Sequence, residues 1–152
     1  MKFECKRATF YDIDDIIYVQ NKGFYQDYKK FGECPGYNPN RKSIMRALTR
    51  ACVYLICVDD QVVGDAIVMK KSSGEYFLGG LCIIPEYQNK GIGHQVMEFL
   101  ENTYIDAKHW SLETPMEKEG NIYFYKKHGF EITDRYLDGT VNVVLLEKVI
   151  AG

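Results

Sequence analysis

The chain has 152 residues, 46% of them apolar and 26% charged, proportions that exclude a disordered chain and predict one domain over residues 1–152. Its formal net charge of −2 supplies no field to capture a polyanion, so we expect no nucleic-acid partner and slightly favour a cationic ligand. Neither repeats nor low-complexity tracts divide the chain.

The first third of the chain predicts one strand followed by helices. Residues 3–7 are typical of a short strand, and Thr9 begins a capping box for a helix that ends near Gly23. Residues 24–40 have no stable period and hold two prolines and two glycines, so we expect a partly helical, aromatic-rich region. Residues 43–51 predict another helical turn or two.

Strands dominate the middle of the chain. Residues 53–58 and 62–69 are apolar runs on either side of a polar turn, and they predict an antiparallel hairpin. A third strand, residues 76–84, follows a second turn. Residues 109–113 predict a short strand parallel to the one that ends at Ile84, because a helix connects the two.

The last part of the chain predicts a helix and a hairpin. Residues 121–128 form the helix, which Gly129 ends in a left-handed conformation, and residues 130–137 and 140–148 pair about an Asp-Gly turn. The complete order is β-α-(α)-β-β-β-α-β-α-β-β. It predicts an α/β (mixed α+β) fold, with a mixed, mostly antiparallel sheet of seven strands flanked by about four helices.

Residues that bind metals or form disulfides are few. The five cysteines are odd in number and contain no CxxC pair, so we expect reduced core residues. Three histidines, none at a two-ligand spacing, argue against a metal site. The N-terminal residues include no apolar signal region, and no later run approaches membrane-spanning length, so we expect a cytoplasmic protein without a membrane partner.

Residues 78–101 combine a strand, a proline, a polar turn with two glycines and an amphipathic helix. The first turn of a helix has free N–H groups and the positive end of the helix dipole, so it favours an anion, usually phosphate. Gly91 and Gly93 let a ligand approach the backbone, although two glycines alone would indicate only a tight turn. Neither GxGxxG nor GxxxxGK followed by Ser or Thr occurs, which argues against a nucleotide-binding regulator.

Residues 85–93 resemble the acetyl-coenzyme A signature of the GNAT family of N-acetyltransferases, in which Gln or Arg is followed by two residues, Gly, one residue and Gly or Ala. The order of predicted elements also matches that family. The resemblance implies an acyl-CoA N-acyltransferase-type fold and acetyl-CoA as cofactor, with coenzyme A as product. It implies that the pyrophosphate is bound by Gln88, Asn89, Lys90, Gly91, Ile92, Gly93 and His94. It also implies that the pantetheine arm pairs with Cys82, Ile83 and Ile84.

A second resemblance lies at residues 121–130, where Asn121 and Tyr125 precede the tripeptide HGF. The two side chains are four residues apart and face the same way on a helix. In the family, the Asn binds the pantetheine arm and the Tyr lies beside the thioester sulfur. A neutral phenol can hydrogen-bond or protonate a departing thiolate, so Tyr125 is the predicted general acid. The alternative is a core aromatic residue, because the chain has twelve tyrosines.

Other assignments have two interpretations. A backbone N–H on residues 81–84 is the expected donor to the carbonyl oxygen that becomes negative during attack. Glu113 is a candidate base, although an outward-pointing surface carboxylate is the simpler interpretation. His94 either contacts phosphate or faces solvent. An aromatic group either shapes an acceptor site or is a locally packed loop; it consists of Phe24, Tyr25, Tyr28, Phe31 and Tyr37.

The sequence therefore predicts an acetyl-CoA-dependent N-acetyltransferase in which a primary amine attacks the thioester directly. The alternative is a non-catalytic acyl-CoA-binding or regulatory module on the same fold. The acceptor is expected to be a small-molecule or peptide amine, and its identity stays open because acceptor pockets use the least patterned segments. A homodimer is compatible with the sequence, but no feature indicates one.

Overall fold

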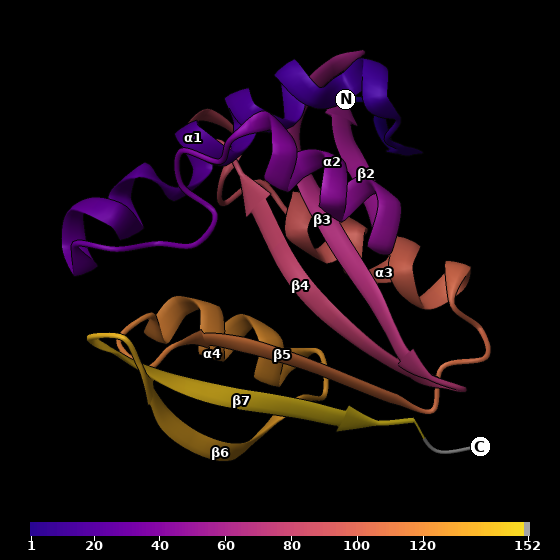
Figure 1. The fold of residues 1–152 in the computed structure, drawn as a ribbon. Helices are drawn as coiled ribbons and strands as arrows, with labels where there is room; N and C mark the ends of the chain where they lie inside the picture. The colour runs from indigo at the N-terminus through magenta and orange to yellow at the C-terminus, as the bar shows by residue number, and fades with distance from the viewer. Residues whose placement is uncertain (151–152) are drawn as a thin grey trace.

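The computed structural model describes residues 1–150 and contains a seven-stranded sheet in the order β1-β2-β3-β4-β5-β7-β6 (Figure 1). The strands are β1 (Phe3–Arg7), β2 (Cys52–Val58), β3 (Gln61–Ser72), β4 (Glu75–Ile83), β5 (His109–Pro115), β6 (Glu131–Asp138) and β7 (Val141–Val149). The helices are α1 (Ile13–Phe31), α2 (Arg41–Arg50), α3 (Ile92–Thr103) and α4 (Glu119–Lys127), with short 3-10 turns at Phe10–Asp12 and Pro85–Tyr87. Every neighbouring pair of strands is antiparallel except β4 and β5. The predicted element order and the mixed, mostly antiparallel sheet are confirmed.

Helices cover both faces of the sheet (Figure 1). On one face, Ile16 of α1 and Ile44 of α2 pack in the same cluster as Leu55 of β2. On the other face, Val96 of α3 packs in the cluster that contains Ile56. Neighbouring residues of β2 thus point to opposite faces. Because both faces are buried, β2 is a continuous apolar run rather than an alternating one.

The turns follow the local sequence. Asp59 and Asp60, with φ of 49° and 68°, join β2 to β3 in the left-handed conformation that suits a two-residue hairpin turn. Gly139 joins β6 to β7 with φ of 61°, and Gly129 follows α4 with φ of 91°. The capping box is present, since the backbone N–H of Thr9 donates to the side chain of the third residue that follows it. These local predictions are confirmed.

The predicted end of the first helix near Gly23 is wrong, because α1 continues to Phe31. It ends at Gly32, which has φ of 75° and donates its N–H to Tyr28 O at 2.8 Å. Gly23 serves packing instead: a Cβ atom there would lie 3.0 Å from Cys82 Cβ on β4. The glycine therefore marks a close approach of helix to sheet, which a sequence pattern does not distinguish from a helix end.

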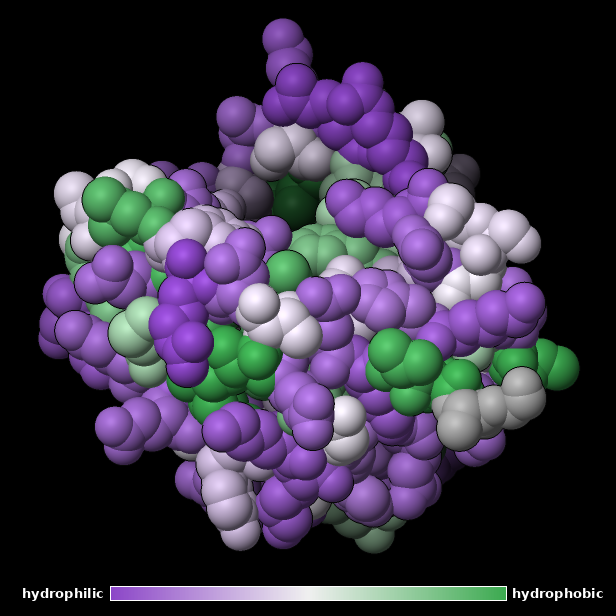
Figure 2. Space-filling view, turned by 90° about the horizontal axis from the view of Figure 1, so that it is seen from below, coloured by the Kyte–Doolittle hydropathy of each residue, from purple (hydrophilic) through white to green (hydrophobic). Residues whose placement is uncertain are grey.

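β4 and β5 are hydrogen-bonded neighbours along only part of their length. Their parallel pairing ends at Leu78 opposite Leu112. Beyond that point β4 stays paired with β3 up to Ile83, and β5 stays paired with β7 up to Pro115. The sheet is therefore open between the C-terminal halves of β4 and β5 (Figure 1). Seen from below, the molecule has a hollow with hydrophobic residues inside and mostly hydrophilic residues around it (Figure 2).

Candidate active site

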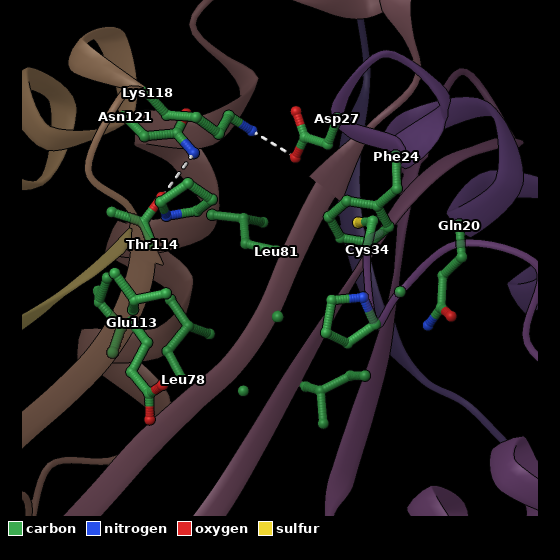
Figure 3. A pocket seen from close by; sticks show the side chains of 18 of the residues that line it. Gln20, Phe24, Asp27, Cys34, Leu78, Leu81, Glu113, Thr114, Lys118 and Asn121 are labelled. Carbon is green, nitrogen blue, oxygen red and sulfur yellow. Dashed lines mark hydrogen bonds and ion pairs between the residues drawn. The ribbon is translucent and has the colours of Figure 1, made fainter. Parts of the chain in front are cut away.

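A cavity of about 710 Å³ borders the opening between β4 and β5. It reaches from α1 and β3 on one side to β5 and α4 on the other (Figure 3). Its polar side chains include Gln20, Asp65, Glu113, Thr114, Asn121 and Tyr125. A largely apolar cavity of this size, with a few polar groups, is typical of a small-molecule site.

Within residues 1–150, two backbone donors on the edge of β4 that faces the opening have no strand partner. Ile84 N–H donates to a carbonyl oxygen of β3 at 2.8 Å. In an antiparallel pair, successive residues direct their backbone groups to opposite edges, so the N–H groups of Leu81 and Ile83 face the edge that β5 has left. Of the three residues predicted to pair with the pantetheine arm, only Ile83 has an N–H directed there. Leu81, which was predicted only within the range 81–84 of the oxyanion donor and not for the arm, is the second.

The side chain of Cys82 takes no part in this edge. It is buried, with 4% exposure, and faces α1. Its Sγ donates to Asp65 Oδ1 at 3.0 Å and lies 3.6 Å from Val19 O, a second acceptor for the same hydrogen. Burial, followed by the nearby Asp65 carboxylate, raises the pKa of the thiol, which keeps it protonated and unreactive.

The turn after β4 leads into α3 and is the turn that the sequence predicts to bind an anion. Gly91 has φ of 79°, and among the described residues no neighbour comes within 4 Å of the point where a Cβ atom would lie, so a ligand can approach it. Within residues 1–150 no side chain caps α3, and the first backbone bond of the helix runs from Gln95 N to Gly91 O at 3.2 Å. The N–H groups of Ile92, Gly93 and His94 therefore have no acceptor within the helix. These three residues were predicted to bind the pyrophosphate, and that assignment stays a prediction.

Gly93 has a second role in packing. A Cβ atom there would lie 3.2 Å from the ring of Phe124 on α4. The missing side chain thus lets α4 approach the first turn of α3. This contact links the anion turn to the helix that carries Asn121 and Tyr125.

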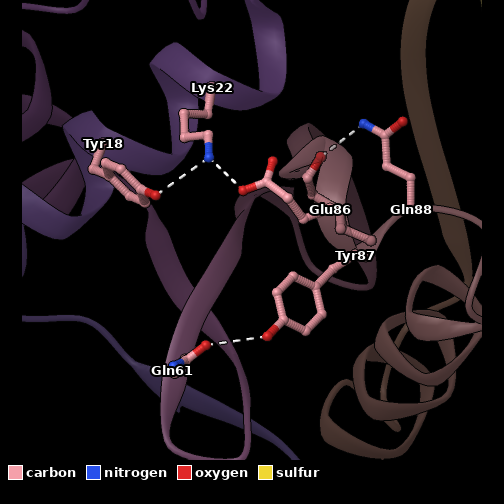
Figure 4. A network of polar contacts seen from close by, with 7 residues as sticks. Tyr18, Lys22, Gln61, Glu86, Tyr87 and Gln88 are labelled. Carbon is pink, nitrogen blue, oxygen red and sulfur yellow. Dashed lines mark hydrogen bonds and ion pairs between the residues drawn. The ribbon is translucent and has the colours of Figure 1, made fainter.

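The side chain of Gln88 is used within the protein rather than directed at a ligand. Its Nε2 donates to Ile83 O at 2.9 Å and closes the loop over the end of β4 (Figure 4). Lys90 places its Nζ 5.4 Å from the ring centre of Tyr87. Asn89 has φ of 58°, which directs the chain into the turn. Gln88 and Asn89 therefore shape the loop.

Two contacts hold the 3-10 turn before this loop against the rest of the molecule (Figure 4). Lys22 of α1 forms an ion pair with Glu86. Tyr87 Oη donates to Gln61 Oε1 at the start of β3, at 3.1 Å. The anion turn is thus attached at one end to α1 and β3.

His94 is largely exposed and contacts two side chains. Its Nε2 lies 2.9 Å from Glu98 Oε1, and its Nδ1 lies 3.4 Å from His128 Nε2. Burial, and then the nearby His94, lowers the pKa of His128. The imidazole of His94 stands beside the anion turn, but it is also open to solvent, so both predicted interpretations fit its position.

Asn121 and Tyr125 both line the cavity from α4. Asn121 Nδ2 donates to Thr114 Oγ1 of β5 at 3.3 Å, which fixes the amide at the opening (Figure 3). Tyr125 is 7% exposed, and within residues 1–150 its hydroxyl has no hydrogen-bond partner. Burial raises the pKa of Tyr125, so the phenol stays neutral and its O–H is free to donate. The structure thus brings together the two residues of the late motif.

Glu113 also lines the cavity, from β5 (Figure 3). Burial and then a hydrogen bond to Glu113 raise the pKa of Tyr136.

The predicted aromatic group divides into two parts. Phe24 and Phe31 line the cavity; Tyr25, Tyr28 and Tyr37 pack on one another outside it, with 4.5 Å between the stacked rings of the last two.

Sequence reasoning missed several polar residues of the cavity, and four of them form two pairs. Gln20 and Asp65 form a buried pair on α1 and β3, and Lys118 forms an ion pair with Asp27. One signal was present for Asp65, because it is a single carboxylate within the apolar run of β3.

Among residues 1–150, no group of three or more His, Cys, Asp or Glu residues could hold a metal ion. In the same part of the chain, no helix is long and apolar enough to cross a membrane.

Comparisons with known proteins agree with this arrangement. Residues 49–132, more than half of the chain, match the family model described as an acetyltransferase (GNAT) domain. No curated protein sequence matches the chain. A PaiA N-acetyltransferase from Thermoplasma acidophilum, solved in complex with coenzyme A, superposes with a TM-score of 0.83, 18% identity and coverage of 99% of this chain and 100% of that chain.

Two further structures are similar. The ribosomal-protein-S18-alanine N-acetyltransferase from Escherichia coli has a TM-score of 0.80 at 15% identity, and the match covers 99% of this chain and 97% of that chain. A GNAT family acetyltransferase from Elizabethkingia anophelis with acetyl-CoA bound has a TM-score of 0.68 at 18% identity, with 97% and 98% coverage. The fold is therefore that of acyltransferases with an opened mixed sheet. The chain belongs to the GNAT acetyltransferase family.

Proposed function

We propose that this protein is an acetyl-CoA-dependent N-acetyltransferase that moves an acetyl group to a primary amine by direct attack. One observation carries the proposal. A free strand edge, an uncapped helix N-terminus and a buried tyrosine whose hydroxyl is unpaired within residues 1–150 border one opening in the sheet. The bound coenzyme A and acetyl-CoA of two structural neighbours support this choice of cofactor.

The residues present fit acetyl-CoA. The free N–H groups of Ile92, Gly93 and His94 would hold the pyrophosphate at the positive end of α3. The N–H groups of Leu81 and Ile83 would pair with the pantetheine arm, and the Asn121 amide would bind the arm from the α4 side. When bound, acetyl-CoA supplies an activated acetyl group as a thioester.

Residues on both sides of the opening would serve the reaction. The amine nitrogen forms a bond to the acetyl carbon, and the carbon–sulfur bond breaks. A free N–H of β4, on Leu81 or Ile83, would stabilise the negative charge on the carbonyl oxygen. Glu113 would take the proton of the attacking amine. The Tyr125 hydroxyl would donate a hydrogen bond to the departing thiolate. Burial raises the pKa of this phenol and so keeps it protonated.

The experiment begins with acetyl-CoA binding by calorimetry, followed by release of CoA thiol with a panel of primary amines. In Tyr125→Phe we expect kcat to fall by about 100-fold, within the range for loss of a general acid, with little change in acetyl-CoA affinity. The control is Tyr123→Phe, because Tyr123 lies on the same helix with 66% exposure.

Failure to bind acetyl-CoA at millimolar concentration would refute the proposed function. Binding without thiol release for any amine would favour the non-catalytic acyl-CoA-binding module. Equal turnover by Tyr125→Phe and wild type would refute the role of the tyrosine alone. The single domain over residues 1–152 and the cytoplasmic location stay predictions.

A further inference from the structure

Asp65 is a buried carboxylate that faces the cavity. It is 1% exposed, accepts a hydrogen bond from Gln20 Nε2 at 2.8 Å and accepts one from Cys82 Sγ at 3.0 Å. Within residues 1–150, no Lys, Arg or His forms an ion pair with it. A buried carboxylate with only neutral donors costs several kcal/mol. Stability therefore does not explain why the group is there.

The cavity as a whole carries excess negative charge. The carboxylates among its lining residues are Asp27, Glu33, Asp65, Glu113 and Asp138. In the part of the chain that the structure describes, its only lining cation is Lys118, whose Nζ lies 2.8 Å from Asp27 Oδ2. The lysine and that aspartate neutralise each other, so the remaining carboxylates leave the cavity selective for cations.

Asp65 lies across the cavity from the groups expected to react. It belongs to β3, whereas Glu113 belongs to β5 and Tyr125 to α4, and β4 lies between these strands in the sheet. Two strand spacings correspond to roughly 10 Å, and the opening between β4 and β5 adds to this. One ammonium group therefore does not contact both Asp65 and Glu113.

We propose that Asp65 binds a second ammonium group of the acceptor, and that the acceptor is an aliphatic diamine or polyamine. This inference rests on the proposed function and names the substrate class of the same site. The bound ammonium provides the counter-charge that Asp65 lacks within residues 1–150. It can also donate a hydrogen bond to Gln20 Oε1, because Gln20 Nε2 already donates to Asp65 and leaves the amide oxygen available. The second, neutral amine of the acceptor then extends along the apolar lining toward the opening at β4 and β5.

Calorimetry on the full chain with saturating coenzyme A tests the inference without any need for turnover. Diaminobutane and diaminopentane are compared with butylamine and pentylamine, which have the same carbon chains and a single ammonium group. We expect the diamines to bind at least 10-fold more tightly. In Asp65→Asn we expect the diamine Kd to rise by about 30-fold or more, and the monoamine Kd by less than about threefold.

Two further variants complete the experiment. Asp60→Asn is the matched control, because Asp60 is an exposed carboxylate in the β2–β3 turn, and it should bind both amines as wild type does. Gln20→Lys places an internal ammonium beside Asp65 and should abolish the preference for diamines even where Asp65→Asn does not fold. Equal affinity of wild type for diamines and monoamines overturns the inference, as does a diamine preference that survives Gln20→Lys or Asp65→Asn.

The outcome is separable from that of the proposed function. Diamine binding that depends on Asp65 supports the inference even where no CoA thiol is released. Thiol release with butylamine as efficient as with diaminobutane supports the acetyltransferase and overturns the inference. When coenzyme A does not bind, the amine titrations are made on the free protein and are judged by the same affinities.

Discussion

At the scale of single residues, Asp65 links the cavity to the stability of the fold. Burial raises the pKa of this carboxyl from 3.8 to about 6, and the hydrogen bonds from Cys82 and Gln20 offset part of that rise. Between these pH values the folded state holds a proton that the unfolded state has lost. The contribution of Asp65 to stability is therefore fully present below pH 3.8 and is lost as the pH rises through about 6.

We expect Asp65→Asn to be as stable as wild type at pH 7, or more stable. The pKa difference between 3.8 and about 6 sets an upper limit of about 3 kcal/mol, and altered hydrogen bonds with Gln20 and Cys82 reduce the gain. The advantage should shrink as the pH falls from 7 to 4. Urea denaturation across this range measures it, with Asp60→Asn as the exposed control. A wild type that gains stability relative to Asp65→Asn as the pH rises would contradict the argument.

At the scale of elements, the turn between β4 and α3 depends on a left-handed residue at its end. Gly91 has φ of 79° and Gly32, which ends α1, has φ of 75°. Neither would place a Cβ atom within 4 Å of another described residue, so the two positions present the same backbone strain to an alanine. They differ only in what lies beside them, because Gly91 precedes the free N–H groups of α3.

The pair Gly91→Ala and Gly32→Ala separates strain from ligand contact. Each variant should lose about 1 to 2 kcal/mol of stability, since a side chain in the left-handed region is disfavoured by that amount. Only Gly91→Ala should weaken acetyl-CoA binding, by about 10-fold or more, because its methyl group would stand at the proposed pyrophosphate site. Urea denaturation gives the stabilities and calorimetry the affinities. Equal affinities for the two variants would show that the anion does not bind at this turn.

At the scale of the whole molecule, the sheet is two parts joined by a short contact. β4 and β5 pair over only four residues each, from Glu75 to Leu78 and from His109 to Leu112. A ligand in the opening would contact both parts and complete the hydrogen bonds that the strands lack. The cofactor would then be a structural link as well as a reactant.

Amide exchange measured by NMR tests this link. With acetyl-CoA, the N–H groups of Leu81 and Ile83 should exchange more slowly, while that of Ile84, already bonded to β3 at 2.8 Å, should change little. At a concentration of 100 times Kd, binding adds about 2.7 kcal/mol, which raises Tm by about 5 to 10 °C for a chain of this size. Protection confined to α1 and α2 would place the cofactor elsewhere.

The sequence alone determined the features that depend on neighbouring residues. Strand β1, the hairpin turns, the cap at Thr9, the left-handed Gly129 and the parallel relation of β4 to β5 all follow from short-range patterns and chain connection. The glycine turn and the pairing of Asn121 with Tyr125 on one helix face were predicted for the same reason.

Only the tertiary structure decided which groups of the site are free. Gln88 bonds back to Ile83, Cys82 turns its thiol to Asp65, and α1 continues past Gly23 because the helix packs closely on β4 there. The pair of Gln20 and Asp65 joins residues 45 positions apart. Such contacts depend on how helices and sheet pack in space, so no local period or spacing in the chain could reveal them.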